Sequence, residues 1–428
     1  MLKIVETFSG IGSQVQALKN TNIEHSVVAI VEWEIGAMYA YDIIHNGPQD
    51  LTNYRHHTKE SLVNTLEKYN LSSDGKEPIS GRTLSSMSVA QLKAILCSIE
   101  RTNNLVDITS VKASEIPNTD VLTYSFPCQD LSVSGHWHKN TLGINRDANN
   151  RSTLIWEIER ILKEYVKEDK DLPKFLLMEN VSNILSTKHI KNFNEWQDFL
   201  EKLGYVNKIY TLDARNFGIP QSRVRTYMIS VLAKNSEQAN AINDYFIINN
   251  LENVYLEKEN VLPLEKFLRL DYSNEKYKLE AIESTPAFTE SRKKIYENNV
   301  ILATDNVVNN SEYARTITTK QDRHPNSGII EYNNQILTDI NKRYRNLTPR
   351  ECFLLMGFKE EQYDLLMANN IDIGNERKFL THSKLIKMAG NSIVVQVLES
   401  IFKQIDEINK TILNEDVDVK SKAVTIAI

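Results

Sequence analysis

The sequence predicts an α/β protein in which a doubly wound, mostly parallel sheet is joined to a second, smaller domain. Three observations lead to this fold class. Short apolar runs alternate with amphipathic stretches through the first half of the chain, as strands and helices alternate in a parallel sheet. Polar or glycine-rich residues directly follow several of the apolar runs. The chain has 428 residues, which is more than one compact core usually holds.

The predicted elements of the sheet domain are short strands separated by helices with apolar residues at helical spacing. Strands are predicted over residues 2–8, 25–34, 120–126, 174–180 and 225–233, and helices over residues 13–20, 152–168 and 193–204. In a doubly wound sheet, ligands bind at the carboxyl ends of the strands. Gly10–Gly12, Glu32, Cys128 and Glu179 all lie at the carboxyl ends of predicted strands, so we expect them at one edge.

The chain divides into three parts. Residues 1–232 are predicted as the sheet domain, with a polar, partly helical insert at about 46–106. Residues 233–342 are Asn-rich and irregular, with short strand-like pieces, and are predicted as the smaller domain. Residues 343–428 return to helical patterning and are predicted to rejoin the sheet domain, although the tail after about 405 has no clear pattern.

Composition excludes several classes of protein. No apolar run reaches the roughly 20 residues that span a membrane, and the N-terminus lacks a signal-peptide pattern, so a cytoplasmic protein is expected. The net charge of −6 gives no global sign of nucleic-acid binding, although a basic cleft can occur on an acidic protein. The three cysteines are widely spaced, which argues against a disulfide framework and a zinc site. No metal is expected.

The segment "FSGIG" (residues 8–12) predicts a nucleotide-type turn between a strand and a helix. Glycines let a ligand approach the backbone, and a helix N-terminus offers free N–H groups. Glu32 ends the next strand, where an acid can bind a ribose diol, and Trp33 can either stack on adenine or pack in the core. Pyrophosphate-binding glycine motifs are absent. A ligand with adenosine but no pyrophosphate therefore fits best, and S-adenosylmethionine is one.

The segment "SFPCQDLSVSG" (residues 125–135) places Cys128 between a strand and a loop of small residues. An isolated cysteine is more often an inert core residue, but Pro127 and the polar residues that follow favour an accessible thiol. Arg223 and Arg225 could stabilise its thiolate. Glu179 ends an apolar strand, where a carboxyl can have a raised pKa; the alternative is a surface glutamate that begins a turn.

In combination these segments resemble the cytosine-C5 DNA methyltransferases. "ETFSGIGSQVQAL" looks like that family's cofactor loop, "SFPCQDLSVSG" its nucleophile motif, "MENV" its glutamate motif and "QSRVRTYMI" its arginine motif. "NLTPRECFLLMGF" and "AGNSIVVQVLESIF" look like its last two motifs. The nucleophile and glutamate motifs look closest to the CpG-type enzymes of wall-less bacteria, which does not settle the target. Ser13 departs from the pattern, since the family commonly has glycine there.

The resemblance implies a methyltransferase sheet domain of the Rossmann-like type, a target-recognition domain at 233–342, and S-adenosylmethionine as cofactor, with S-adenosylhomocysteine as product. It implies Cys128 as the nucleophile that attacks C6 of cytosine and Glu179 as the contact to N3 and the exocyclic amine. Arg225 would hold O2, Arg223 would support the same site, and Asn180 would brace the loop. The implied cofactor contacts are Phe8, Ser9, Gly10, Gly12, Glu32, Trp33, Asp107, Ile108, Leu154, Asn391 and Ser392.

The resemblance also implies duplex DNA as the partner, with the target cytosine flipped out of the helix. The loop at about 129–147 would close over the DNA as a lid, and the segment 314–328 is the most DNA-like piece of the smaller domain. The implied DNA contacts are Gln129, Ser132, Ser134, Lys139, Arg146, Arg315, Thr318, Lys320 and Arg323. A solvated loop and an ordinary hairpin are the alternatives. The chain is expected to act as a monomer, and its sequence does not decide whether a separate cognate restriction endonuclease accompanies it.

Three other functions fit parts of the sequence. An RNA cytosine methyltransferase would use the same motifs, but the "CFT" signature of the eukaryotic tRNA-directed relatives is absent. A catalytically silent DNA-binding relative is disfavoured by the intact Cys128, Glu179 and Arg225. A nucleotide-dependent oxidoreductase is disfavoured by the missing pyrophosphate loop.

Overall fold

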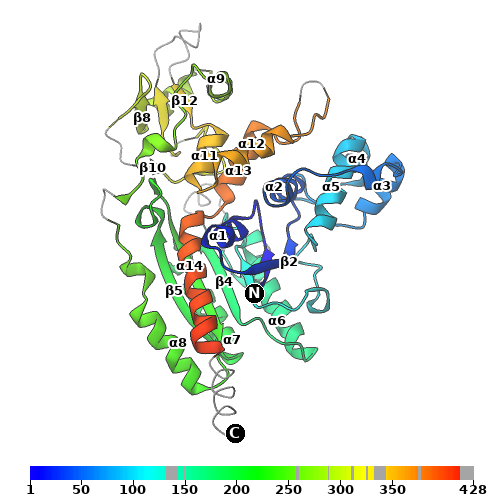
Figure 1. Ribbon diagram of the computed structural model, residues 1–428, viewed down its shortest axis with the longest axis vertical. Coiled ribbons are helices and arrows are strands. Elements are labelled where there is room, and N and C mark those ends of the chain that lie inside the picture. The colour runs from blue at the N-terminus through cyan, green and yellow to red at the C-terminus, as the bar shows by residue number, and fades with distance from the viewer. Residues whose placement is uncertain are drawn as a thin grey trace, which may run out of the picture.

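A six-stranded sheet with the order β2-β1-β3-β4-β7-β5 forms the centre of the protein (Figure 1). The computed structural model describes residues 1–131, 143–148, 150–256, 260–287, 289–309, 313–323, 326–331, 344–374 and 377–414. The strands of the sheet are β1 Leu2–Thr7, β2 His25–Val31, β3 Val121–Tyr124, β4 Phe175–Val181, β5 Tyr205–Asp213 and β7 Val224–Leu232. β1 to β4 run parallel, and β7 runs antiparallel to both β4 and β5. The predicted mostly parallel sheet is confirmed.

Strand register brings the predicted site to one edge of this sheet. Thr7, the last residue of β1, is aligned with Val31 of β2 and with Tyr124 of β3, and Tyr124 is aligned with Met178 of β4. The next residue along each of these strands is Phe8, Glu32, Ser125 or Glu179. The segments that carry the candidate residues therefore leave the sheet side by side.

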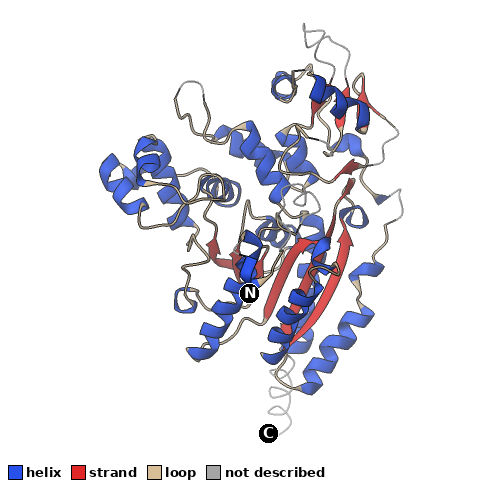
Figure 2. Ribbon diagram, turned by 180° about the vertical axis from the view of Figure 1, so that it is seen from behind, coloured by secondary structure: helices blue, strands red, loops and turns tan. Residues whose placement is uncertain are grey.

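Alternate residues of the central strands enter two separate cores, as in a doubly wound sheet. In β4, Phe175 and Leu177 belong to the core that also contains α1 and α14. Leu176 and Met178 belong to the core that contains α6 and α7. These helices are α1 Ser13–Thr21, α6 Ile155–Lys167, α7 Ile190–Lys202 and α14 Val395–Ile408. Helices cover both faces of the sheet in the two opposite views (Figures 1 and 2).

The predicted insert is a group of helices beside the β2 edge of the sheet (Figure 1). It follows α2 Ile35–Asn46 and contains η1 Thr52–Tyr54, α3 Lys59–Leu66, α4 Gly81–Ser86 and α5 Val89–Arg101. The Ser88 hydroxyl accepts a hydrogen bond from the Gln91 N–H, and the Gln91 side chain accepts from the Ser88 N–H, so a capping box begins α5. α5 packs against both α2 and α3, which attaches the insert to the sheet domain.

The region from residue 233 onward begins with α8 Ser236–Ile248, which packs against β5. A four-stranded sheet with the order β12-β11-β8-β9 then forms at the top of Figure 1. Its region contains α9 Glu275–Glu283, α10 Glu290–Asn298, β8 Ile301–Thr304, β9 Val307–Val308, β11 Ile329–Glu331 and β12 Tyr344–Asn346. β10 Ala314–Arg315 instead pairs with β6 Gln221–Ser222, close to the central sheet.

Residues 314–320 pair as a strand only over the two residues of β10, and side-chain hydrogen bonds replace the strand pairing beyond it. The Thr316 hydroxyl donates to the Ser222 carbonyl (2.6 Å), and the Ile317 N–H donates to the Gln221 side-chain oxygen (3.0 Å). These bonds still attach the stretch to the residues that precede β7.

Helices α11 Pro349–Leu355, α12 Glu360–Ala368 and α13 His382–Asn391 lead back to α14, which packs against α1 (Figure 1). A π-helical turn, η11 Asn409–Leu413, follows α14.

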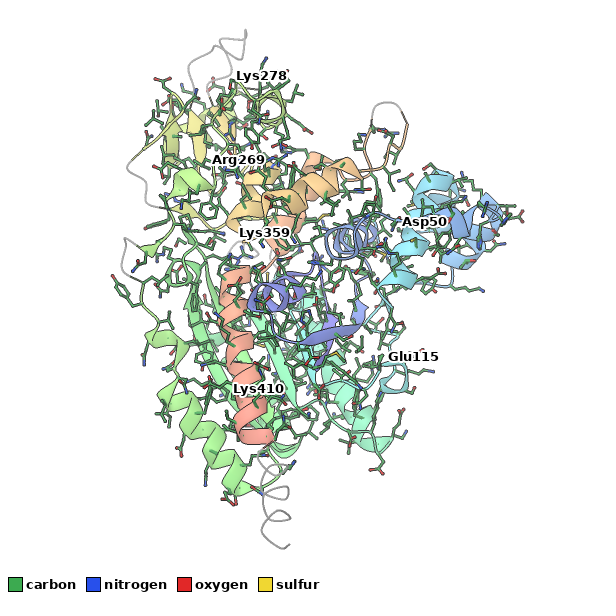
Figure 3. The ribbon with its side chains drawn as sticks, in the orientation of Figure 1. Asp50, Glu115, Arg269, Lys278, Lys359 and Lys410 are labelled. Carbon is green, nitrogen blue, oxygen red and sulfur yellow. The ribbon has the colours of Figure 1, made fainter. Side chains whose placement is uncertain are left out.

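Among the described residues, one helical stretch, His382–Leu413, is long and apolar enough to cross a membrane, but 67% of its apolar window is buried inside the protein. Charged side chains such as Asp50 and Lys410 point outward (Figure 3). The remaining short helices are η2 Ala113–Glu115, η4 Arg146–Ala148, η5 Arg151–Leu154, η6 Ser182–Leu185, η7 Ala214–Phe217, η8 Leu251–Asn253 and η10 Leu264–Lys266.

Candidate active site

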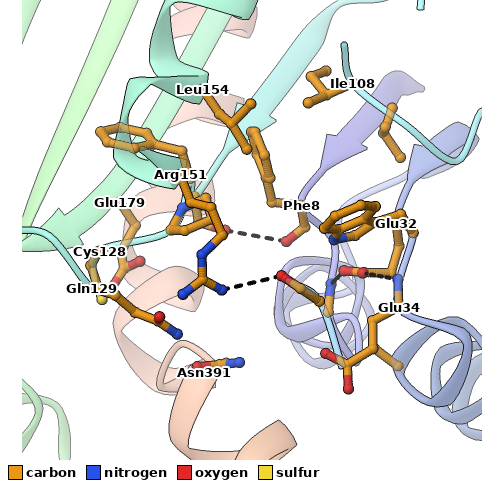
Figure 4. Close-up of a pocket in the computed structure, with 18 of the residues that line it drawn as sticks. Phe8, Glu32, Glu34, Ile108, Cys128, Gln129, Arg151, Leu154, Glu179 and Asn391 are labelled. Atoms are coloured by element: carbon orange, nitrogen blue, oxygen red, sulfur yellow. Dashed lines mark hydrogen bonds between the residues drawn. The ribbon is translucent and has the colours of Figure 1, made fainter. Parts of the chain in front are cut away.

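A cavity of about 560 Å³ lies at the carboxyl ends of β1, β2, β3 and β4. This volume is in the range of small-molecule sites. In Figure 4, Cys128 and Glu179 lie at one end of the cavity and Glu32 at the other. The predicted residues that line it are Phe8, Gly10, Glu32, Trp33, Asp107, Ile108, Cys128, Gln129, Leu154, Glu179, Arg223, Arg225 and Asn391. The structure therefore brings most of the predicted cofactor and catalytic residues together.

The turn after β1 has left-handed backbone at Phe8 (φ 55°), Gly10 (φ 55°) and Gly12 (φ 79°). A Cβ at Gly12 would lie 2.3 Å from the His45 ring, so only glycine fits against this histidine. A Cβ at Gly10 would meet no atom within 4 Å, because this position faces open space. Gly12 therefore serves packing, while Gly10 leaves room beside the backbone for a ligand. Ser9 is buried behind the turn.

Glu32 is held in the cavity wall by backbone donors. Its two carboxylate oxygens accept hydrogen bonds from the Gly10 N–H (2.9 Å) and the Glu34 N–H (2.8 Å). Burial raises the pKa of the Glu32 carboxyl to about 7, and the Glu34 N–H opposes that shift. Asn104, which sequence reasoning missed, accepts from the Glu32 N–H (3.0 Å) and donates to its carbonyl (2.8 Å). Asn104 thus fixes the end of β2.

Asp107 lies at the same end of the cavity. Its Oδ1 accepts from the Thr109 N–H (3.0 Å), and its Oδ2 accepts from the Thr109 hydroxyl (2.8 Å) and from Asn70 of the insert (2.5 Å). Phe8, Trp33, Ile108 and Leu154 add apolar surface around it. An acid among apolar and aromatic side chains can hold a flat, polar-edged ring such as a purine.

At the other end of the cavity, three side chains donate hydrogen bonds to main-chain carbonyls of the loop that carries Cys128. Asn180 donates to the Phe126 carbonyl (3.0 Å), and the Ser152 hydroxyl donates to the Pro127 carbonyl (2.7 Å). Asn183 donates to the Leu131 carbonyl (2.6 Å). Ser152 and Asn183 were missed in the sequence because no local pattern links them to this loop.

The thiol environment combines burial with positive charge. Burial raises the pKa of the Cys128 thiol, while the Arg225 and Arg223 guanidinium groups oppose the shift. Burial also raises the pKa of the Glu179 carboxyl, again opposed by Arg225 and Arg223. Arg225 Nε lies 3.5 Å from Glu179 Oε1. A protonated Glu179 could donate to a ring nitrogen of a bound base.

Arg223 and Arg225 have different surroundings although they are two residues apart. The buried Arg223 donates to the carbonyls of Ile317 (2.9 Å), Gly390 (3.1 Å) and Ser392 (2.7 Å). Burial lowers its pKa to about 9. Arg225 instead extends toward Glu179 and the Val224 carbonyl. Arg223 joins the segment after β10 to the end of α13, while Arg225 remains available to a ligand in the cavity.

The last predicted motif closes the site from the side of α13. Asn391 ends α13 and lines the cavity. Ser392 is buried, and its hydroxyl lies 2.5 Å from the Ser13 hydroxyl, which also accepts from the Ile393 N–H (3.3 Å). Ser13 begins α1 without left-handed backbone. The serine at this position therefore joins the cofactor turn to the segment after α13.

Residues 83–407 match the family described as C-5 cytosine-specific DNA methylase. The chain belongs to this family. It is 32% identical over 412 residues to the orphan methyltransferase M.SssI of Spiroplasma monobiae, covering 94% of this chain and 97% of that one. It is 31% identical over 414 residues to the type II methyltransferase M2.ScrFI of Lactococcus lactis subsp. cremoris, and the match covers 95% of this chain and 99% of that one. The family predicted from the sequence motifs is confirmed.

Solved structures agree on the fold of this DNA methylase. The Dnmt2 methyltransferase of S. pombe superimposes with a TM-score of 0.57 at 19% identity, covering 97% of this chain and all of that one. A DNMT2 mutant of Spodoptera frugiperda gives a TM-score of 0.54 at 16% identity, and the match covers 94% of this chain and 99% of that one. At these identities the likeness shows the fold alone.

Apart from Arg146, the predicted DNA contacts of the methylase fall into three groups: outside the described residues, in the cavity, and on the segment 315–323. Ser132, Ser134 and Lys139 lie outside the described residues. Gln129 lines the cavity, Arg315 is half-buried in β10, and Thr318, Lys320 and Arg323 are exposed. A Cβ at Gly390, which lines the cavity, would lie 2.5 Å from the Thr318 carbonyl carbon. The segment with Thr318 therefore lies at the rim of the cavity.

Arg146 is engaged with other side chains in this structure. It donates to Glu159 (2.5 Å) and Glu195 (2.7 Å) and lies 3.7 Å from the centre of the Trp156 ring. A contact between Arg146 and a DNA phosphate would require these bonds to exchange.

Proposed function

We propose that this DNA methylase transfers the methyl group of S-adenosylmethionine to C5 of a cytosine flipped out of duplex DNA, through a covalent bond between Cys128 and C6. One observation carries the proposal. Cys128, Glu179 and Arg225 share a single cavity with Glu32, Trp33 and Asp107. A base bound at the first group and an adenosine-containing cofactor bound at the second would therefore meet inside one cavity.

The residues at the Glu32 end fit S-adenosylmethionine. The Glu32 carboxylate can accept hydrogen bonds from ribose hydroxyls, Trp33 and Ile108 offer apolar surface to adenine, and Asp107 can accept from its exocyclic amine. The open space at Gly10 leaves room for the amino-acid part of the cofactor. When bound, the cofactor supplies an electrophilic methyl group. No pyrophosphate-binding loop is needed for this ligand.

The residues at the Cys128 end can activate cytosine, whose C5 is a poor nucleophile. The Cys128 thiolate adds to C6, while Glu179 protonates or hydrogen-bonds N3 and Arg225 holds O2. The resulting enamine carries nucleophilic character at C5. After methylation, a base removes the C5 proton, and elimination of the Cys128 thiolate restores the aromatic ring. Burial of Glu179 favours its protonated form, which suits donation to N3.

A cytosine within a duplex cannot reach Cys128, so the base must leave the helix, at a cost of a few kcal/mol. Gln129 and the segment with Thr318, Lys320 and Arg323 are proposed to contact the DNA, since they lie in the cavity or are exposed on a segment at its rim. Residues 233–342 are proposed to select the target sequence. Exchange of this region for that of a relative should change the methylated sequence and preserve the chemistry; an unchanged target would refute this assignment.

Methyl transfer with tritiated S-adenosylmethionine tests the reaction, with duplex DNA and tRNA compared as substrates. We expect labelling of DNA alone, and labelling of tRNA alone would favour the RNA-directed alternative. Cys128→Ser should abolish transfer while cofactor binding stays near normal. DNA with 5-fluorocytosine at the target should form a covalent adduct on the Cys128 peptide, because fluorine at C5 cannot leave as a proton. Absence of this adduct at a cognate site would refute the covalent mechanism.

Two properties of the enzyme in its cell are also proposed. We propose that it acts as a monomer, which sedimentation of the protein with and without duplex DNA tests. A separate restriction endonuclease with the same target is proposed as its companion, as the type II name of the Lactococcus relative suggests for that protein. Bisulfite sequencing of plasmid from cells that express the chain gives the target, and a nuclease assay on that target in the source cells tests the companion.

A further inference from the structure

The helical insert reaches the cofactor end of the cavity through one tight turn, residues 70–78, which we call the insert turn. Its backbone pairs with the segment directly after Glu32: the Ser72 N–H donates to the Trp33 carbonyl (2.8 Å), and the Ile35 N–H donates to the Ser72 carbonyl (2.9 Å). Leu71 is buried in the main core. The insert turn is therefore part of the wall that presents Glu32 and Trp33.

Ionic and polar contacts join the insert turn to the opposite sides of the cavity. Lys387 of α13 bonds to the Asp74 carbonyl and to the Glu34 carboxylate (2.6 Å). Arg151 donates to the Gly75 carbonyl (3.2 Å) across the cavity (Figure 4). Gly75 has left-handed backbone (φ 69°), and a Cβ there would lie 3.0 Å from Glu34. The insert turn thus spans the cofactor end of the cavity.

Asn70 is the side chain of the insert turn that touches a predicted cofactor residue. It lines the cavity and donates from Nδ2 to Asp107 Oδ2. Asp107 Oδ2 also accepts from the Thr109 hydroxyl, whereas Oδ1 accepts only from the Thr109 N–H within the part of the chain that the structure describes. A carboxylate oxygen accepts two hydrogen bonds. The contacts of Asn70 and Thr109 therefore orient the carboxylate with one acceptor position open on Oδ1.

We propose that Asn70 is a positioning residue of the cofactor site, and that through it the insert holds Asp107 in the orientation that accepts the exocyclic amine of adenine. This inference rests on the proposed use of S-adenosylmethionine. It gives the insert a role in recognising the adenine ring of the cofactor. Without Asn70, Asp107 can rotate or pair with water, and its bond to the amine weakens.

The test compares two ligands by isothermal titration of the full-length protein: S-adenosylhomocysteine, and an analogue whose purine carries hydrogen in place of the exocyclic amine. For Asn70→Ala, we expect affinity for S-adenosylhomocysteine to fall about tenfold, or about 1.4 kcal/mol. Affinity for the analogue should stay near that of the wild type, because the analogue cannot use Asp107. The matched control is Asn64→Ala, an exposed asparagine on α3 of the same insert, which should leave both affinities unchanged.

The pair of ligands distinguishes a positioning role of Asn70 from a purely structural one. Asn70 is largely exposed, so its replacement should leave the thermal unfolding midpoint unchanged, which circular dichroism checks. An equal loss for both ligands would mean that Asn70 only shapes the insert turn, and unchanged affinity for both would mean that it has no role; either result overturns the inference. If the wild-type protein bound neither ligand, the proposed function itself would fail.

Discussion

Replacement by lysine should lower the stability of the protein at Arg223 and its methyl-transfer activity at Arg225, although these residues flank Val224 at the start of β7. The buried guanidinium of Arg223 makes three hydrogen bonds of 2.7–3.1 Å to main-chain carbonyls. Two of these carbonyls, of Gly390 and Ser392, lie at the C-terminal end of α13, where helix carbonyls lack partners and a cation is favourable. The lysine ammonium has three donors on one nitrogen, so it can take the place of Nη1, which bonds to Ile317, or of Nη2, which bonds to Gly390 and Ser392, but not of both.

The magnitude follows from the bonds lost. A hydrogen bond to a charged group contributes about 1.5–3 kcal/mol, so the loss of one or two in Arg223→Lys should lower the free energy of unfolding by about 1.5–6 kcal/mol. Burial already lowers the pKa of Arg223 to about 9. Because the ordinary pKa of lysine is lower than that of arginine, a lysine there would tend to lose its proton, which adds to the loss. The total is a large fraction of a typical protein stability of about 5–15 kcal/mol.

Arg225→Lys is the matched control. The Arg225 side chain bonds to the adjacent Val224 carbonyl and lies 3.5 Å from Glu179. Because lysine keeps a positive charge beside Glu179, the replacement should change the free energy of unfolding by about 1 kcal/mol or less. If Arg225 holds O2 of the base, methyl transfer should fall on the order of 10²-fold, as for the loss of a donor that stabilises developing charge.

Urea unfolding followed by circular dichroism measures the stability of both variants, and tritium transfer to DNA measures their turnover. The expected pattern is a marked shift in unfolding for Arg223→Lys and a loss of turnover with normal unfolding for Arg225→Lys. If Arg223→Lys unfolded at the same urea concentration as the wild type, the reasoning from its three carbonyl contacts would be wrong.

Three further predictions concern the cofactor turn and the thiol. Because the pKa of Glu32 is raised to about 7 and ribose donors favour its ionised form, S-adenosylhomocysteine binding near pH 7 should release a proton; calorimetry in buffers of different ionisation enthalpy measures it, and Glu32→Gln should abolish it. Since burial raises the pKa of the Cys128 thiol, its alkylation by iodoacetamide in DNA-free enzyme should accelerate only at alkaline pH. A plot of alkylation rate against pH with its midpoint below the ordinary thiol pKa of about 8.5 would contradict this. Ser13→Ala removes the partner of the buried Ser392 hydroxyl (2.5 Å) and should lower the unfolding free energy by about 1–3 kcal/mol; unchanged thermal unfolding would refute the role of this pair.

Local pattern was enough to predict the central sheet and the segments that enter the site. Apolar runs read as strands form β1, β2, β3, β4 and β7, and polar residues after the first four reach one edge because parallel strands end together. The strand β5 was missed because polar residues interrupt its apolar ones, as in "YVNKIYTLD". Its place at the edge of the sheet explains this composition, since an edge strand is only partly covered.

Side chains that hold the site from a distance could not be read from the sequence. Asn104 fixes Glu32 from 72 positions along the chain, and Asn70 bonds to Asp107 across 37. Ser13 and Ser392 meet across 379 positions. Arg146 was predicted at DNA because it is a cation in a polar loop, yet Glu159, Glu195 and Trp156 surround it here.

The amino-acid sequence therefore determines the alternation of strands and helices, the family, and the types of residue at the strand ends, because these depend on neighbours along the chain. Tertiary structure decides which polar side chains satisfy one another, such as Arg223 with the end of α13. A buried polar group must find a partner wherever the folded chain brings one within about 3 Å. That partner is set by three-dimensional packing, which no local pattern encodes.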